Sequence, residues 1–165
     1  MTSYQLPALV DQATGARRAL RRGRPVEAGN LVIQYQPSWL VRCKVTLRRA
    51  LLGPRIYFTT VLVDGTTGRA EACLFDGRLL QQGTEVQVDA DPAPAISLAE
   101  AERLAERAAM SSVLKRNHTF WLPVIEARGE ALVRFPHWVG HSPGKGTVRV
   151  NAVTGEVDLR RDQNG

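Results

Sequence analysis

The sequence predicts an α+β protein built from two repeats, each a helix packed on an antiparallel β-meander. Three observations predict this fold: helical periodicity changes to strand alternation twice, a proline-rich stretch divides the chain, and one short motif occurs on both sides of it. The 165 residues carry a formal net charge of +6, and 44% of them are hydrophobic. This balance is typical of a globular protein that folds without a metal or a disulfide.

The first region, residues 1–90, is expected to begin with a helix and to continue as strands. Residues 41–48 alternate apolar and polar, which predicts a half-buried strand with Cys43 pointing inward. Further strands are expected over residues 56–63, 69–75 and 85–88. The apolar face of the helix is predicted from five residues at helical spacing: Leu6, Leu9, Val10, Ala13 and Leu20.

The second region, residues 91–165, begins within a proline-rich linker at residues 89–95. Ser97 followed by Glu100 is typical of a helix start, because each side chain can accept a backbone N–H of the first turn. Strands are expected over residues 120–127, 131–139, 147–150 and 157–160, with Gly129 and residues 144–146 between them. The helix should bury Leu98, Ala101, Leu104, Ala105 and Ala108.

The strongest signal is an internal repeat. Residues 61–68, Val-Leu-Val-Asp-Gly-Thr-Thr-Gly, match residues 148–155, Val-Arg-Val-Asn-Ala-Val-Thr-Gly. Upstream, Pro-x-Trp occurs once in each region, and the first copy holds 12 more residues between its proline and its last glycine, which predicts a longer hairpin around residues 51–55. The equivalent residues are Pro37, Trp39, Asp64, Thr67 and Gly68 in the first region and Pro136, Trp138, Asn151, Thr154 and Gly155 in the second.

Each Thr-Gly motif is interpreted as a turn that reverses the chain. The side chain of Asp64 or Asn151 can accept backbone N–H groups two or three residues ahead, and Gly68 or Gly155 can adopt the left-handed conformation. A phosphate-binding loop would instead need several glycines, a lysine and a following helix. We therefore expect a structural role for the motif.

Residues 148–157, Val-Arg-Val-Asn-Ala-Val-Thr-Gly-Glu-Val, resemble the end of the PepSY domain, a helix followed by an antiparallel meander. Residues 61–70 match it more loosely. The resemblance implies two diverged copies of a PepSY/cystatin-like fold and a non-catalytic module. Such domains are often inhibitory segments of secreted peptidases, whereas this chain has Asn151 at the usual aspartate and no secretion signal. We expect a cytoplasmic protein in which Cys43 and Cys73 are reduced.

No set of catalytic residues can be assembled from the sequence. Ser111, Ser112 and Ser142 lack the setting of an activated nucleophile. His137 and His141 could offer two imidazoles to a metal, but a third ligand would have to come from His118, a cysteine or a carboxylate. We expect no enzyme, no metal and no cofactor, with a small hydrolase or an inhibitor-type domain as the alternative.

The positive charge is concentrated in the first region, whose net charge is +5 against +1 for the second. If the first helix and the strand at residues 41–48 face the same way, their cations form a patch that binds anions. The alternative is a solvated surface that serves solubility. The cations are Arg17, Arg18, Arg21, Arg22 and Arg24 of the helix region and Arg42, Lys44, Arg48 and Arg49 of the strand region.

The leading functional hypothesis is binding of a partner protein, through a sheet edge or the arginine-rich face. Non-specific binding of nucleic acid by the arginines of residues 17–24 is the alternative. Open strand edges also allow a homodimer, and no apolar run is long enough for membrane insertion. Trp39 and Trp138 are expected as core anchors; the alternative is an aromatic peptide groove of Tyr35, Trp39, Phe120, Trp121, Phe135 and Trp138.

Overall fold

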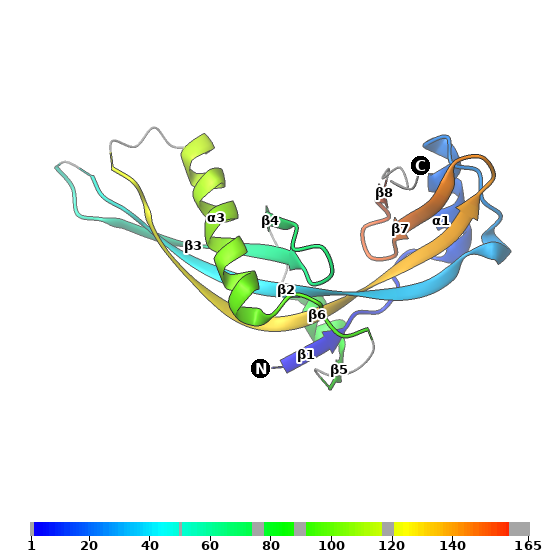
Figure 1. Ribbon diagram of the computed structural model, residues 1–165, viewed down its shortest axis with the longest axis horizontal. Coiled ribbons are helices and arrows are strands. Elements are labelled where there is room, and N and C mark those ends of the chain that lie inside the picture. Colours follow the sequence, from blue (N-terminus) through cyan, green and yellow to red (C-terminus); the bar gives the residue numbers. More distant parts are fainter. Residues whose placement is uncertain (1, 50, 74–77, 88–91, 117–120, 159–165) are drawn as a thin grey trace.

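The computed structural model describes residues 2–49, 51–73, 78–87, 92–116 and 121–158. These residues form an α+β fold with one mixed sheet of eight strands and three α-helices, so the predicted fold class is confirmed at this level. The strands follow the order β4-β3-β2-β6-β1-β5. In addition, β7 pairs with the C-terminal part of β6, and β8 pairs with β7. The molecule is elongated and curved, with helices at both ends (Figure 1).

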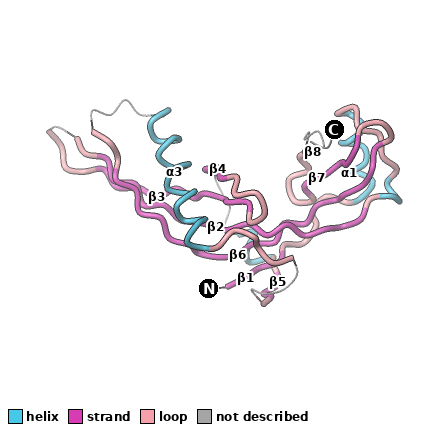
Figure 2. The backbone as a smooth tube through the Cα atoms, viewed as in Figure 1, coloured by secondary structure: helices cyan, strands magenta, loops and turns pink. Residues whose placement is uncertain are grey.

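Two long antiparallel strands, β2 (Val32–Leu47) and β6 (Val124–Ser142), run the length of the molecule (Figure 2). Their pairing is symmetric about the pair Gln36 and Phe135: Trp39 lies opposite Leu132, and Ile33 lies opposite Trp138. Each strand therefore contributes one half to each end of the molecule.

The α3 lobe consists of β3 (Arg55–Asp64), β4 (Ala70–Cys73) and α3 (Leu98–Arg116) with the adjoining halves of β2 and β6. The predicted start of α3 is confirmed, because the backbone N–H of Glu100 donates to Ser97 Oγ at 3.3 Å. Its predicted apolar face is also confirmed, since Ala101 and Ala105 are fully buried and Leu104 packs on the same core. Cys43 is buried there, as expected.

The α1 lobe consists of α1 (Gln12–Arg21), the 3-10 helix η1 (Ala28–Asn30), β7 (Gly146–Asn151) and β8 (Val157–Asp158) with the other halves of β2 and β6. The predicted face of the first helix is wrong. Leu6 precedes the helix, Leu9 and Leu20 are exposed, and the buried side is made by Gly15, Ala16 and Ala19. Small residues are required because the Trp138 ring lies 3.1 Å from where a Cβ of Gly15 would stand.

The expectation that a helix packs on the meander following it is wrong for α1 and incomplete for α3, which packs on β6 of its own region and also on β3 and β4 of the first region. Helix α1 packs with Val148 and Val150 of β7, whereas α3 packs with Val61 and Val63 of β3. The reason is that β2 continues as one strand through its midpoint instead of turning back. Its first half stays beside α1, and its second half continues with β3 toward the opposite end (Figure 1).

A small layer lies on the sheet face opposite α3, and of its elements the sequence predicted only the strand near residues 85–88 (Figure 1). Strand β1 (Thr2–Gln5) pairs in parallel with β6 and antiparallel with β5 (Thr84–Val86), next to the short helix α2 (Arg78–Gln82). Leu6 and Leu40 are buried beneath it, and buried Arg134 donates to the Ser3 hydroxyl.

The strands expected over residues 56–63 and 147–150 are confirmed as β3 and β7. The division expected at Gly129 is wrong, because β6 passes through it with a bulge opposite Leu40 and Val41. There the N–H of Gly129 donates to Glu102 Oε1 at 2.8 Å. Some expected strand ends and part of the linker lie outside the described residues: residues 74–75, 88, 89–91, 120 and 159–160. The division of the chain at residue 90 stays a prediction.

Candidate functional site

The two Thr-Gly motifs form turns with the same hydrogen bonds. Asp64 Oδ1 accepts the N–H groups of Thr66 and Thr67 at 2.8 and 3.2 Å, and Asn151 Oδ1 accepts those of Val153 and Thr154 at 2.8 and 3.1 Å. Gly68 and Gly155 have φ values of 72° and 75°. Both turns therefore adopt the conformation that the sequence predicted.

Each turn lies beside a tryptophan that ties the sheet to the start of a helix. Trp39 Nε1 donates to the carbonyl of Ile96, just before α3, at 2.7 Å, and Trp138 Nε1 donates to the carbonyl of Val10, just before α1, also at 2.7 Å. A backbone hydrogen bond also connects each turn to a central strand. The N–H of Gly65 donates to the carbonyl of Pro37 in β2, and the N–H of Ala152 donates to the carbonyl of Pro136 in β6, both at 2.8 Å. Trp39 is buried and Trp138 partly buried, as expected of core anchors.

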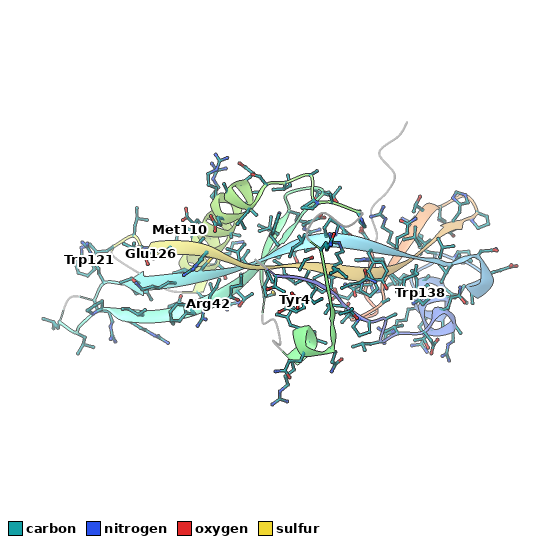
Figure 3. All side chains as sticks on the ribbon, turned by 90° about the horizontal axis from the view of Figure 1, so that it is seen from below. Tyr4, Arg42, Met110, Trp121, Glu126 and Trp138 are labelled. Atoms are coloured by element: carbon teal, nitrogen blue, oxygen red, sulfur yellow. The ribbon has the colours of Figure 1, made fainter. Side chains whose placement is uncertain are left out.

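The aromatic groove is not present in the described residues. Phe135 is buried in the cluster beneath β1, and Trp121 lies at the far end of the molecule from Trp138 (Figure 3). Phe120 lies outside the described residues.

Both turns line a single polar groove of about 740 Å³, which joins the two lobes over the middle of β2 and β6. Gln36, Ser38 and His137 contribute from the central strands. The β3–β4 side contributes Asp64, Arg69, Glu71 and Cys73; the β7–β8 side contributes Arg149, Asn151, Gly155, Glu156 and Asp158; and α1 contributes Arg18, Arg21 and Arg22.

Three of the five arginines predicted near the first helix lie in this groove. Arg18 Nη1 donates to the carbonyl of Thr154 at 2.9 Å, which connects α1 to the second turn. Arg17 instead donates to the Thr14 hydroxyl, and Arg24 donates to the carbonyl of Lys145. The helix periodicity thus separates Arg17 from the groove-facing arginines, whereas Arg24 lies after the end of the helix.

The cations of the strand region lie in the other lobe. Arg42 pairs with Glu130 at 3.5 Å, and Lys44 pairs with Glu126 at 3.1 Å, both on the neighbouring strand. Arg48 and Arg49 are exposed near the β2–β3 loop. Arg42 and Glu126 stand on the opposite side of the molecule's middle from Trp138 (Figure 3). The two groups of cations therefore do not form the common patch that the sequence allowed.

Two of the carboxylates in the groove, those of Asp64 and Glu71, have side-chain partners, whereas that of Glu156 has none among the described residues. Burial alone would raise the pKa of Asp64, but hydrogen bonds from Thr67, Thr66 and Gln36 outweigh it and lower the pKa. Glu71 pairs with Arg69. By contrast, the guanidinium groups of Arg21 and Arg22 have no hydrogen-bond or ionic partner among the residues that the structure describes. Within the described residues, the groove cations whose side chains lack a partner are therefore Arg21 and Arg22 on the α1 side and Arg149 on β7.

The nucleophilic and basic side chains of the groove are not coupled. Burial lowers the pKa of His137, whose Nδ1 lies 3.1 Å from the carbonyl of Phe135. Burial raises the pKa of Cys73, which favours the unreactive thiol. His141 lies beyond the groove, near α1 and Pro143. No three metal-ligand side chains gather in the described part of the chain, and His118 lies outside it.

Sequence reasoning missed the groove itself, including Gln36, Ser38, Arg69 and Arg149. An alignment of the two copies of the repeat indicates where the groove lies. When the two copies are aligned, Ser38 matches His137, and Arg69 matches Glu156, so polar side chains recur at corresponding positions on both sides of one symmetric strand pair.

None of the helices in the described residues is long and apolar enough to cross a membrane. Comparisons of the chain with protein-family models, with curated proteins and with solved structures found no match.

Proposed function

We propose that the protein is a non-catalytic binding module that holds an extended acidic segment of a partner protein in the groove between the two Thr-Gly turns. The observation that carries this proposal is the position of Arg21 and Arg22, whose guanidinium groups lack partners among the described residues and line the groove. Guanidinium groups bind carboxylates with two parallel hydrogen bonds, so an acidic segment suits this position.

Two strand edges beside the groove favour an extended segment. Within the described residues, β4 pairs only with β3, and β8 pairs only with β7. Both strands line the groove, through Glu71 and Cys73 on one side and Val157 and Asp158 on the other. An open edge offers backbone N–H and C=O groups to an added strand, as in other modes of peptide binding.

The architecture of this module is proposed to be two PepSY-like units that exchange their helices and first strand segments. The proposal is supported by the β2–β6 register about Gln36 and Phe135, by the equal turns, and by the equal bonds of Trp39 and Trp138. Each unit would consist of the helix and one strand half from one copy of the repeat, packed against the last strands of the other copy. The groove then lies where the two copies meet.

A catalytic role has less support in the groove. The only imidazole that lines it, that of His137, hydrogen-bonds neither Ser38 nor Cys73, so no nucleophile–base pair is assembled among the described residues. Nucleic-acid binding by the arginines at residues 17–24 also has less support, because Arg17 and Arg24 lie outside the groove and the cations at residues 42–49 stand in the other lobe. A nucleic-acid surface would be expected to align them.

A ten-residue fluorescein-labelled peptide of alternating Glu and Val tests the proposal by fluorescence anisotropy. We expect the double variant Arg21→Gln/Arg22→Gln to bind at least tenfold more weakly, because each lost hydrogen bond to a charged group contributes about 1.5–3 kcal/mol. The matched control, Arg17→Gln/Arg24→Gln, removes the same charge from outside the groove and should bind as the wild type does.

Equal weakening by the two double variants would contradict the proposal, because it would mean that only the total charge matters. A duplex DNA of 20 base pairs is measured in parallel. Tighter binding of DNA than of the peptide, with equal loss in both double variants, would contradict the proposal and favour the nucleic-acid alternative.

A further inference from the structure

The far end of the α3 lobe gathers most of the exposed large apolar side chains of the described chain. Eight of the twelve belong to this end, and only Leu9, Leu20, Val32 and Ile33 lie elsewhere. Leu51 is 96% exposed and Leu122 is 74% exposed. The eight are Leu51, Leu52, Ile56, Phe58, Leu114, Trp121, Leu122 and Val124. A surface this apolar on a folded protein marks a site of interaction.

We call Leu51, Leu52, Trp121 and Leu122 the apolar tip. Leu51 and Leu52 stand in the loop between β2 and β3, and Trp121 and Leu122 lead into β6, beside that loop (Figure 1). Trp121 is seen at the extreme end of the molecule (Figure 3). The tip is a narrow projection, not a broad face, because it is the end of a long twisted hairpin and the strand beside it.

Positive charges predominate around the apolar tip. Residues 43–63 and residues 107–125 contain no Asp and no Glu, and Glu126, which follows the second range, pairs with Lys44. They contain seven cations, of which only Lys44 has an ionic partner in the described structure. The cations are Lys44, Arg48, Arg49, Arg55, Arg107, Lys115 and Arg116.

We propose that this end of the molecule docks on an anionic membrane surface, with the apolar tip in the headgroup layer and the surrounding arginines on lipid phosphates. Leucine with tryptophan is the composition that a bilayer interface favours, and basic residues next to it are attracted by anionic lipids. The narrow shape favours a bilayer over a folded protein, since a stable protein interface needs about 800 Å² from each partner. No segment crosses the bilayer in this arrangement.

This inference is independent of the groove, because it uses no residue that lines it. It also assigns a role to the extra length of the first hairpin. Between its proline and its last glycine the first copy has 12 residues more than the second, and Leu51 and Leu52 lie in the loop of that longer hairpin. The α1 lobe, with its short β6–β7 turn, has no corresponding tip.

Sedimentation with lipid vesicles tests the docking. We use vesicles of phosphatidylcholine alone and vesicles with about 30% phosphatidylserine, a fraction that gives the negative surface potential needed to attract cations. The wild type should sediment with the anionic vesicles only. Leu51→Ser/Leu52→Ser and, separately, Arg48→Gln/Arg49→Gln should each lower the bound fraction about tenfold, because both apolar burial and charge are needed for stable attachment.

A matched control removes exposed leucines from the opposite end. Leu9→Ser/Leu20→Ser should sediment as the wild type does, because these side chains are 54% and 61% exposed and lie in the α1 lobe. Tryptophan emission gives a second measurement: anionic vesicles should shift it to shorter wavelength in the wild type but not in Trp121→Phe, if Trp121 enters the interface.

Three results would overturn the proposal. One is the absence of sedimentation of the wild type with anionic vesicles. Another is sedimentation that Leu51→Ser/Leu52→Ser leaves unchanged, because the apolar tip would then not enter the membrane. The third is a dimer, found by analytical ultracentrifugation, that the tip variant converts to a monomer without any vesicle binding by the wild type, which would assign the tip to a second copy of this chain.

Discussion

The α1 lobe and the α3 lobe both pack a tryptophan of the sheet against a helix, but they do so with different helix residues. Each places one tryptophan against small residues of a helix and donates the indole N–H to the carbonyl before that helix. The α3 lobe uses a helix of 19 residues with Ala101 and Ala105 buried, whereas the α1 lobe uses a helix of 10 residues with Gly15 and Ala19. A shorter helix covers less of the sheet, which leaves Trp138 more exposed than Trp39.

The lobes differ most where the first hairpin extends beyond its helix. The β2–β3 hairpin is long enough to carry Leu51 and Leu52 away from α3, whereas the β6–β7 turn ends next to α1. The difference indicates that the shared parts, the turns and tryptophans, maintain the fold. The unshared parts, the hairpin tip and the arginines on α1, are the better places to look for function.

The largest difference between the lobes should appear when their tryptophans are removed. We expect Trp39→Ala to lower the free energy of unfolding by about 4 kcal/mol, because it empties a fully packed site. Trp138→Ala should cost about 2 kcal/mol, because that ring already has a partly exposed surface. Urea denaturation measures both. Trp39→Phe serves as a control that keeps most of the ring volume, and equal losses in the two alanine variants would show that the lobes are packed equally well.

A smaller effect is expected from the turn glycines. Gly68→Ala should cost about 2 kcal/mol, since a left-handed alanine is strained by about 1–2 kcal/mol and its Cβ would also stand 3.2 Å from Leu104 Cδ1. Gly155→Ala should also cost about 2 kcal/mol, because its Cβ would displace the side chain of Arg18 from its hydrogen bond to the Thr154 carbonyl.

Thermal unfolding of these two variants is compared with that of Gly29→Ala, which has open space around it and no left-handed backbone. This control should stay within about 0.5 kcal/mol of the wild type. A stable Gly68→Ala variant would contradict the close packing of the first turn against α3.

The smallest effect is expected from the difference at the first residue of the two turns, Asp64 against Asn151. The lowered pKa of Asp64 means that its carboxylate stabilises the fold above the unfolded pKa of about 3.9, and that this contribution is lost as the pH falls through the folded pKa. Asp64→Asn should therefore cost about 1 kcal/mol at pH 7 and less at acidic pH, because the wild type loses this contribution as its carboxylate is protonated.

Unfolding in urea at pH 7 and at pH 3 gives the two values. The converse variant, Asn151→Asp, should show the opposite trend, with more stability at pH 7 than at pH 3, because its side chain accepts the same two N–H groups. If the loss caused by Asp64→Asn is the same at both pH values, the carboxylate charge has no role in the first turn.

Short-range features were decided by the sequence alone. The Thr-Gly turns, the start of α3 at Ser97 and the alternation that buries Cys43 depend on residues within a few positions of one another, so local hydrogen bonds and periodicity are sufficient to predict them. The face of α1 was not predictable in this way, because its buried side consists of Gly15, Ala16 and Ala19, whose small size matters only against Trp138.

Only the tertiary structure decided which strands each helix covers and which side chains meet in the groove. Periodicity shows that a face is apolar, but not which partner will bury it. The uninterrupted course of β2 past Gln36 sends α1 to the strands of the second region and brings Arg21 and Arg22 beside two turns that are far away in the chain. Pairings across such separations, including that of β1 with β6, are set by the packing of the whole sheet, because no local interaction specifies them.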